Sequence, residues 1–224
     1  DHRDLHSFPT RRSSDLISSD GRYVVFQSAA SNLVCTDFNG SHDVFIRDTL
    51  VGETKLVSIS VDGGGSGLGT SANPRLTPTG NFVAFQSTAG NLVAEGVDTN
   101  RVTDVFRYNV VSGQTELASR GVQGQLADSD SYHPVISRDG RYVGFTTNAT
   151  NPVDGDTNGL PDGYVRDLQL GATRLVSPHS QGGPLGINGS RPLAVSFDGR
   201  VAAFSGFGDD QGLNDNNRFQ DIYV

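Results

Sequence analysis

The chain has 224 residues and a formal net charge of −8 at pH 7, from 25 Asp and Glu against 17 Lys and Arg. This acidic balance argues against nucleic acid as a partner, because proteins that bind the phosphate backbone carry an excess of basic residues. No stretch approaches the roughly 18 consecutive apolar residues of a membrane-spanning helix, so the sequence predicts no membrane span. The single cysteine, Cys35, rules out an internal disulfide.

Residues 1–16 differ in character from the rest of the chain. They fit no repeat, and residues 6–16, HSFPTRRSSDL, resemble the translation of a common sequencing-adapter oligonucleotide. We therefore expect residues 1–16 to be a non-native, disordered segment and consider the fold from residue 17 onward. We also expect a chain cut at both ends, since it contains no Met and residues 221–224 stop where the equivalent residues 43–46 continue into Arg47 and Asp48.

A two-part phrase recurs at a period of about sixty residues. Its first part, a turn ending in Gly followed by an apolar strand, occupies residues 19–26, 78–85, 138–145 and 197–204. Its second part is an Asp-x-Asn-x-x-x-Asp loop with the same internal spacing in every copy. Such copies in register predict a repeat protein with units at about 17–67, 68–125, 126–184 and 185–224.

Short strands can be assigned within each unit. The first strand is expected to begin after Pro74, Pro134 or Pro192, because a missing N–H costs no ladder bond at a strand start. The second strand, as in residues 23–26, is apolar at successive positions, which indicates that both of its faces are covered. The third and fourth strands follow the acidic loop, and no window predicts an amphipathic helix.

Four antiparallel strands, covered on both faces and repeated radially, are typical of propeller blades. The sequence therefore predicts an all-β fold. We expect a β-propeller fragment of about four blades of four-stranded antiparallel sheet, two of them complete and two partial.

The repeated residues resemble the TolB-like (WD40-like) propeller repeat family, whose blades carry an S-x-D-G-x-x-[IVA]-x-F phrase. The similarity covers residues 17–224, and the A-x-N-L-V runs at residues 30–34 and 89–93 resemble a subset found in secreted bacterial proteins. The resemblance implies a parent of about six to eight blades and an extracytoplasmic location, periplasmic or secreted. It implies no single activity, because propellers host both binding and catalytic functions.

The acidic loops are candidate calcium sites, because Ca²⁺ prefers oxygen ligands at such spacing. The candidate ligands are Asp37, Asn39, Asp43, Asp98, Asn100, Asp104, Asp154, Asp156, Asn158, Asp162, Asp215, Asn217 and Asp221. The third loop has the most favourable composition, since Asp154 adds a further carboxylate. The alternative is structural: Asp and Asn side chains accept backbone N–H bonds, and the last Asp fixes entry into the third strand.

No catalytic residue is predicted. A catalytic site is normally single, whereas these acidic loops recur in every unit. The chain has no G-x-S-x-G elbow, P-loop or dinucleotide fingerprint, and beyond residue 16 its histidines share no metal-ligand spacing. No cofactor other than calcium is expected.

Further positions recur at equivalent places and predict contacts shared by the blades. Arg47, Arg107 and Arg166 suggest salt bridges such as Arg47 with Asp48 or Arg166 with Asp167, and the aromatic residues Tyr23, Phe82 and Tyr142 suggest packing. Two segments depart from the repeat and are candidate recognition features: Tyr132-His133, expected in a link between blades, and residues 207–210.

Two functions of different classes are consistent with these observations. The first is a non-catalytic extracytoplasmic binding or scaffold module, with calcium in its loops and a protein or cell-wall carbohydrate partner. The second is an accessory or gating propeller of a larger hydrolase resembling prolyl oligopeptidase, which a G-x-S-x-G elbow in flanking sequence would establish. Exposed blade edges are expected to promote self-association.

Overall fold

The computed structural model describes residues 16–152, 160–176, 191–206 and 221–224. Within them the regular structure is β-strand apart from one 3-10 turn, η1 (Gly90–Leu92). The strands are β1 (Leu16–Ile17), β2 (Tyr23–Ser28), β3 (Asp43–Asp48), β4 (Glu53–Leu56), β5 (Ser71–Leu76), β6 (Phe82–Ser87), β7 (Asp104–Asn109), β8 (Thr115–Leu117), β9 (Ser131–Ile136), β10 (Tyr142–Thr147), β11 (Asp162–Asp167), β12 (Ala172–Leu175), β13 (Arg191–Val195), β14 (Ala202–Gly206) and β15 (Asp221–Tyr223). In this part of the chain, no helix is long and apolar enough to cross a bilayer.

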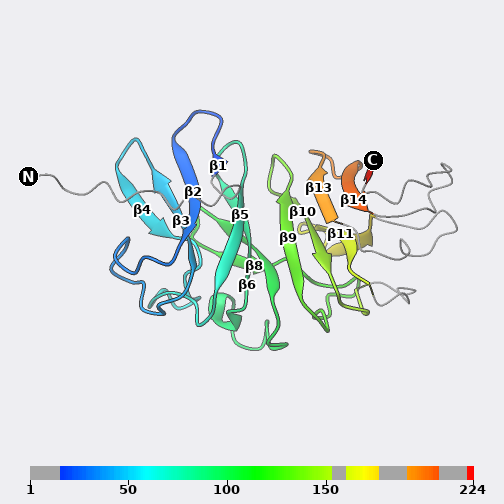
Figure 1. The fold of residues 1–224 in the computed structure, drawn as a ribbon, viewed down its shortest axis with the longest axis horizontal. Helices are drawn as coiled ribbons and strands as arrows, with labels where there is room; N and C mark the ends of the chain where they lie inside the picture. The colour runs from blue at the N-terminus through cyan, green and yellow to red at the C-terminus, as the bar shows by residue number, and fades with distance from the viewer. Residues whose placement is uncertain (1–15, 153–159, 177–190, 207–220) are drawn as a thin grey trace, which may run out of the picture.

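The strands form antiparallel sheets whose order follows the sequence. Three sheets have four strands, in the orders β1-β2-β3-β4, β5-β6-β7-β8 and β9-β10-β11-β12, and a fourth has the order β13-β14-β15. The sheets succeed one another along the molecule in chain order (Figure 1). We refer to them as the first to fourth blades. The predicted all-β, bladed architecture is confirmed, although the first blade is four-stranded where a partial blade was expected, with a β1 of only two residues.

The S-x-D-G phrase forms a closed turn at the start of the second strand of a blade. Ser18 Oγ donates to Asp20 Oδ1 over 2.5 Å and accepts the N–H of Tyr23 over 2.9 Å. Gly21 follows with a φ of 72°, in the left-handed region that glycine occupies without strain. The same bonds recur at Ser137 and Ser196, so this part of the repeat is a hairpin device.

The predicted position of the prolines was wrong. Pro74, Pro134 and Pro192 lie inside β5, β9 and β13, at positions where the pairing register shifts. Such a bulge interrupts the ladder, so the missing proline N–H removes no regular hydrogen bond there. The residue before Pro74, Asn73, has a φ of 53°. Its N–H donates to the side chain of Gln27 in the previous blade over 2.9 Å.

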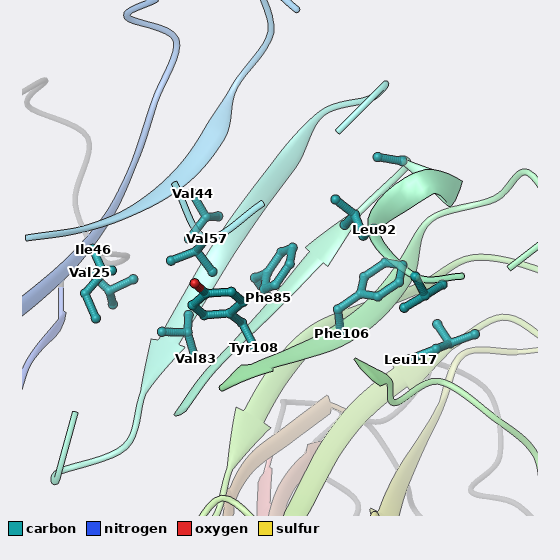
Figure 2. Close-up of a cluster of buried hydrophobic side chains, with 12 residues drawn as sticks. Val25, Val44, Ile46, Val57, Val83, Phe85, Leu92, Phe106, Tyr108 and Leu117 are labelled. Atoms are coloured by element: carbon teal, nitrogen blue, oxygen red, sulfur yellow. The ribbon is translucent and has the colours of Figure 1, made fainter. Parts of the chain in front are cut away.

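The core lies between neighbouring sheets, where large side chains of one blade pack against smaller ones of the blade before it. The first blade contributes Val25, Val44, Ile46 and Val57, and the second contributes Val83, Phe85, Phe106 and Tyr108 (Figure 2). The next interface joins Ala84, Val105 and Ala118 to Val143, Phe145 and Tyr164. Because alternate strand residues point to opposite faces, β6 serves both interfaces, with Val83 and Phe85 in the first and Ala84 in the second, as predicted for an apolar second strand.

Aromatic residues at the start of each second strand also connect the blades. A Cβ atom added to Gly80 would lie 2.3 Å from the Tyr23 ring, and Gly140 has the same relation to Phe82. The aromatic ring of the preceding blade therefore packs directly on the turn glycine, in the space that a side chain there would occupy. The recurrence of these aromatic residues is explained by packing.

The predicted salt bridges were wrong in their partners. Asp48 pairs with Arg22 over 2.7 Å, and Asp167 pairs with Arg141 over 2.6 Å. Each pair joins the second and third strands, because the residue after the turn glycine lies beside the end of the third strand. Arg47 instead donates to Thr54 on the neighbouring strand over 3.0 Å.

Candidate functional site

One end of the sheets is covered by long connections, which we call the loop face: residues 29–42, 57–70, 88–103 and 118–130 (lower side of Figure 1). These segments are bonded to one another. The N–H of Ser66 donates to the carbonyl of Thr36 over 3.0 Å, and the N–H of Val61 donates to Asn91 of the next blade over 2.9 Å. The connections are therefore held in place by the backbone of neighbouring blades.

The central Asn of each described acidic loop is structural. The amide nitrogen of Asn39 donates to the carbonyl of Gly67 over 2.8 Å, and its oxygen accepts the N–H of Ser41 over 2.7 Å. Asn100 has the same partners in the second blade, the carbonyl of Ala127 at 3.1 Å and the N–H of Val102 at 3.3 Å. The Asn thus ties its loop to the following link between blades.

The last Asp of the loop locks the start of the third strand. Ser58 Oγ donates to Asp43 Oδ1 over 2.6 Å and accepts the N–H of Val44 over 3.0 Å. Ser119 makes the same two bonds with Asp104 and Val105 in the second blade, over 2.5 and 3.0 Å. Sequence reasoning missed these serines, although both follow their aspartate by fifteen residues.

The first Asp of the first-blade loop has no such partner among the described residues, whereas Asp98 of the second blade accepts the backbone N–H of Asn100. Asp37 is 4% exposed, and neither of its carboxylate oxygens receives a hydrogen bond from the described residues. The outer oxygens of the last aspartates, Oδ2 of Asp43 and Oδ2 of Asp104, are also buried without a bond there. In the second blade, Asp98 is half-buried and lines a cavity of about 350 Å³ together with Thr88 and Arg101.

Burial changes the acidity of these groups. Loss of solvent raises the pKa of Asp104 to about 6, although Ser119 and Asn100 partly offset this by hydrogen bonding, and the charges of Asp98 and Asp130 raise it further. The pKa of Asp43 is also raised, chiefly by burial.

The remaining predicted site residues fall in two groups. Asp154, Asp156, Asn158, Asp215, Asn217 and residues 207–210 lie outside the described residues. Asp162 and Asp221 begin β11 and β15, equivalent to Asp43 and Asp104. Among the described residues, no three His, Cys, Asp or Glu side chains converge as a metal cluster.

Tyr132-His133 was placed wrongly in a link between blades. Both residues belong to β9, and His133 is the residue before the bulge proline, with a φ of 54°. Its N–H donates to Gln86 of the preceding blade over 3.1 Å, as Asn73 does to Gln27. The backbone of this pair therefore follows the repeat.

We expect an Asp104→Asn variant to change the pH dependence of stability. The pKa of Asp104 is about 6 in the folded chain against an ordinary value of 3.8, so its contribution to stability is fully present below about pH 4 and is lost as the pH rises through 6. At neutral pH the buried charge of Asp104 lowers the free energy of unfolding by about 3 kcal/mol. Asn carries no charge and keeps an oxygen that accepts the hydrogen bond from Ser119.

Urea unfolding in chelator at about pH 4 and about pH 7.5 measures this difference. Asp104→Asn should gain stability relative to wild type only at the higher pH, by up to about 3 kcal/mol. A difference that stays constant with pH would contradict the assignment of a buried charge to Asp104.

Several solved structures are similar to this chain in fold. The β-propeller domain of the Trilobed protease from Pyrococcus furiosus has a TM-score of 0.53 and 10% identity, over 94% of this chain and 53% of that chain. A prolyl endopeptidase has a TM-score of 0.51 and 12% identity, over 86% of this chain and 25% of that chain. TolB from Acinetobacter baumannii has 18% identity and a TM-score of 0.46, over 92% of this chain and 41% of that chain.

These likenesses concern the fold. With the repeated sheets, the two protease propellers establish that the described chain is made of β-propeller blades. The chain spans less than half the length of TolB from Acinetobacter baumannii and of a putative TolB from Agrobacterium tumefaciens, which is also among the similar structures. The sequence matches no protein-family model and no curated protein.

Proposed function

We propose that this chain is a non-catalytic binding module that presents its loop face to a protein partner outside the cytoplasm. The supporting observation is that the loop face combines bonded, positioned connections with large exposed apolar side chains. Phe38, Val61 and Leu68 are 75%, 59% and 83% exposed, and all three lie in the first blade and its link. Exposed apolar and aromatic side chains on a held scaffold are typical of protein interaction sites.

A non-catalytic role is favoured by the way the repeated polar groups are used. Both described Asn side chains and both described Asp–Ser pairs are engaged in holding loops and strand ends. A general acid or base would have to reach a substrate, whereas Asp43 and Asp104 are fully buried. The extracytoplasmic location follows the sequence resemblance to TolB-type repeats.

Binding measurements with matched surface variants test the proposal. The wild-type chain would be immobilised and exposed to fractionated extracytoplasmic proteins, purified peptidoglycan and soluble polysaccharides. A Phe38→Ser, Leu68→Ser double variant should lose at least about tenfold in affinity for the bound component. The control is Leu50→Ser with Val111→Ser, which alters side chains 75% and 83% exposed in the turns between third and fourth strands, at the other end of the sheets.

Equal weakening by both double variants, or by neither, would contradict a role for the loop face. Binding only to peptidoglycan or polysaccharide would replace the protein partner by a carbohydrate. Turnover of peptide or glycoside substrates by the purified chain would contradict a non-catalytic module.

The gated-hydrolase alternative stays a prediction. Two similar structures belong to proteases, but at 10% and 12% identity they indicate a shared fold only. A G-x-S-x-G elbow in adjoining coding sequence is the observation that would favour it.

A further inference from the structure

We propose that the acidic loop of the first blade binds a calcium ion through the carboxylates of Asp37 and Asp43, whereas the second blade supplies a positive charge of its own at the equivalent place. The proposed calcium site does not depend on the proposed binding function of the loop face. The two loops share their Asp-x-Asn-x-x-x-Asp spacing, so the difference arises from residues outside the motif.

The first argument is the condition of Asp37. Its side chain is 96% buried, with both oxygens lacking a hydrogen-bond donor among the described residues, and Asp43 adds a second buried oxygen of the same kind. Asp37 lies six residues before Asp43 in the same loop, and both residues are buried. An isolated buried carboxylate is costly unless it is paired or coordinates a metal ion.

The second argument is a comparison between blades. In the second blade, Arg120 donates to the carbonyls of Gly124 and Val97 over 2.7 and 2.9 Å, and this second bond places its guanidinium beside Asp98. The corresponding residue of the first blade is Ile59. The equivalence is fixed by two facts: each residue follows the serine that locks the last Asp, and each forms an isolated bridge across its link.

The first loop therefore lacks the cation that the second loop has. Among the described residues, the basic side chain whose charge reaches Asp43 is His42, which is exposed. The first blade thus has an apolar residue, Ile59, at the position where the second blade has arginine. An ion from solution would supply the missing charge.

Calcium suits this arrangement better than a transition metal. All available ligands are hard oxygens, and calcium accepts six to eight of them in irregular geometry, including main-chain carbonyls and water. The described residues bring no third His, Cys, Asp or Glu to the site, as a protein zinc centre would require. Bound there, calcium would fix the loop that carries Phe38.

Thermal unfolding of the full chain in chelator, millimolar Ca²⁺ and millimolar Mg²⁺ tests the proposal, with three variants. Asp37→Asn should melt at the same or a higher temperature than wild type in chelator, because it removes an unpaired buried charge. It should also lose part of the calcium response. Wild type should gain about 5 °C or more from calcium well above its dissociation constant.

Two variants in the second blade provide the matched comparison. Asp98→Asn should leave the calcium response at the wild-type value. Arg120→Ile, which gives the second blade the residue of the first, should enlarge the response by creating a second cation-dependent loop. The calcium-induced rise in melting temperature of wild type, minus that of Asp37→Asn, is the part due to the first loop and excludes calcium bound elsewhere.

Several results would overturn the proposal. These are no calcium response in wild type, an equal response in Asp37→Asn, an equal effect of Mg²⁺, and an Asp37→Asn variant destabilised alike with and without calcium. That last result would make Asp37 a structural cap. Loss of the response in Asp98→Asn would remove the distinction between the two blades.

Discussion

Replacement of Phe85 by Ala is expected to destabilise the chain by about 3–5 kcal/mol, the range for truncating a fully buried aromatic residue. The Phe85 side chain is 0% exposed and stacks on Phe106 with ring centroids 5.8 Å apart. It belongs to the cluster between the first two blades, where Val44 and Val57 of the first blade also lie. Truncation would leave a cavity between rigid sheets, which cannot close without separating ladder partners.

Urea unfolding gives the change in free energy, and Phe26→Ala is the control. Phe26 occupies the equivalent position of the first blade and stacks on Phe45 with centroids 5.7 Å apart, but it is only partly buried. Its replacement should cost less than that of Phe85, because less apolar surface is removed from water. Equal losses at the two positions would show that contact between the blades adds nothing to the stacked pair.

The second large effect is expected for Gly140→Ala, at about 2–4 kcal/mol of destabilisation. Gly140 has a φ of 78°, where an added side chain is strained, and its Cβ would lie 2.3 Å from the Phe82 ring. The ring cannot move aside easily. Arg107 lies over it at 4.7 Å and donates to the carbonyl of Gly140 itself over 2.6 Å.

Gly21→Ala separates the two causes of this loss. Gly21 occupies the same turn of the first blade with a φ of 72°, and a Cβ added there would meet nothing within 4 Å. Its replacement should cost only about 1 kcal/mol, the conformational part alone. Thermal and urea unfolding of both variants provide the comparison, and equal costs would contradict the direct packing of the Phe82 ring on Gly140.

The strands were predictable because local patterns define them. Apolar runs bounded by Asp-Gly turns and acidic loops predicted the second and third strands, and the repeat predicted that every blade would resemble the next. The bulges were not predictable in this way. A proline can precede a strand or sit inside one, and the choice depends on whether a side chain such as Gln27 is present to bond the displaced N–H.

In the acidic loops, too, one part was predictable from the sequence and another was not. Their spacing was consistent with capping and with cation binding, because both uses require oxygen atoms at those positions. The structure divides the motif: Asn39 and Asn100 tie loops to links, Asp43 and Asp104 lock strands, and Asp37 has no hydrogen-bond partner among the described residues. This assignment depends on serines fifteen residues away.

The sequence by itself determined the all-β architecture, the repeat and the turn chemistry, because these depend on residues a few positions apart. Tertiary structure alone decided which contacts join one blade to the next: Tyr23 on Gly80, Phe82 on Gly140, and Phe85 on the valines of the first blade. Such pairs are separated by tens of residues and carry no local signal, since their meeting depends on how one sheet is placed against another.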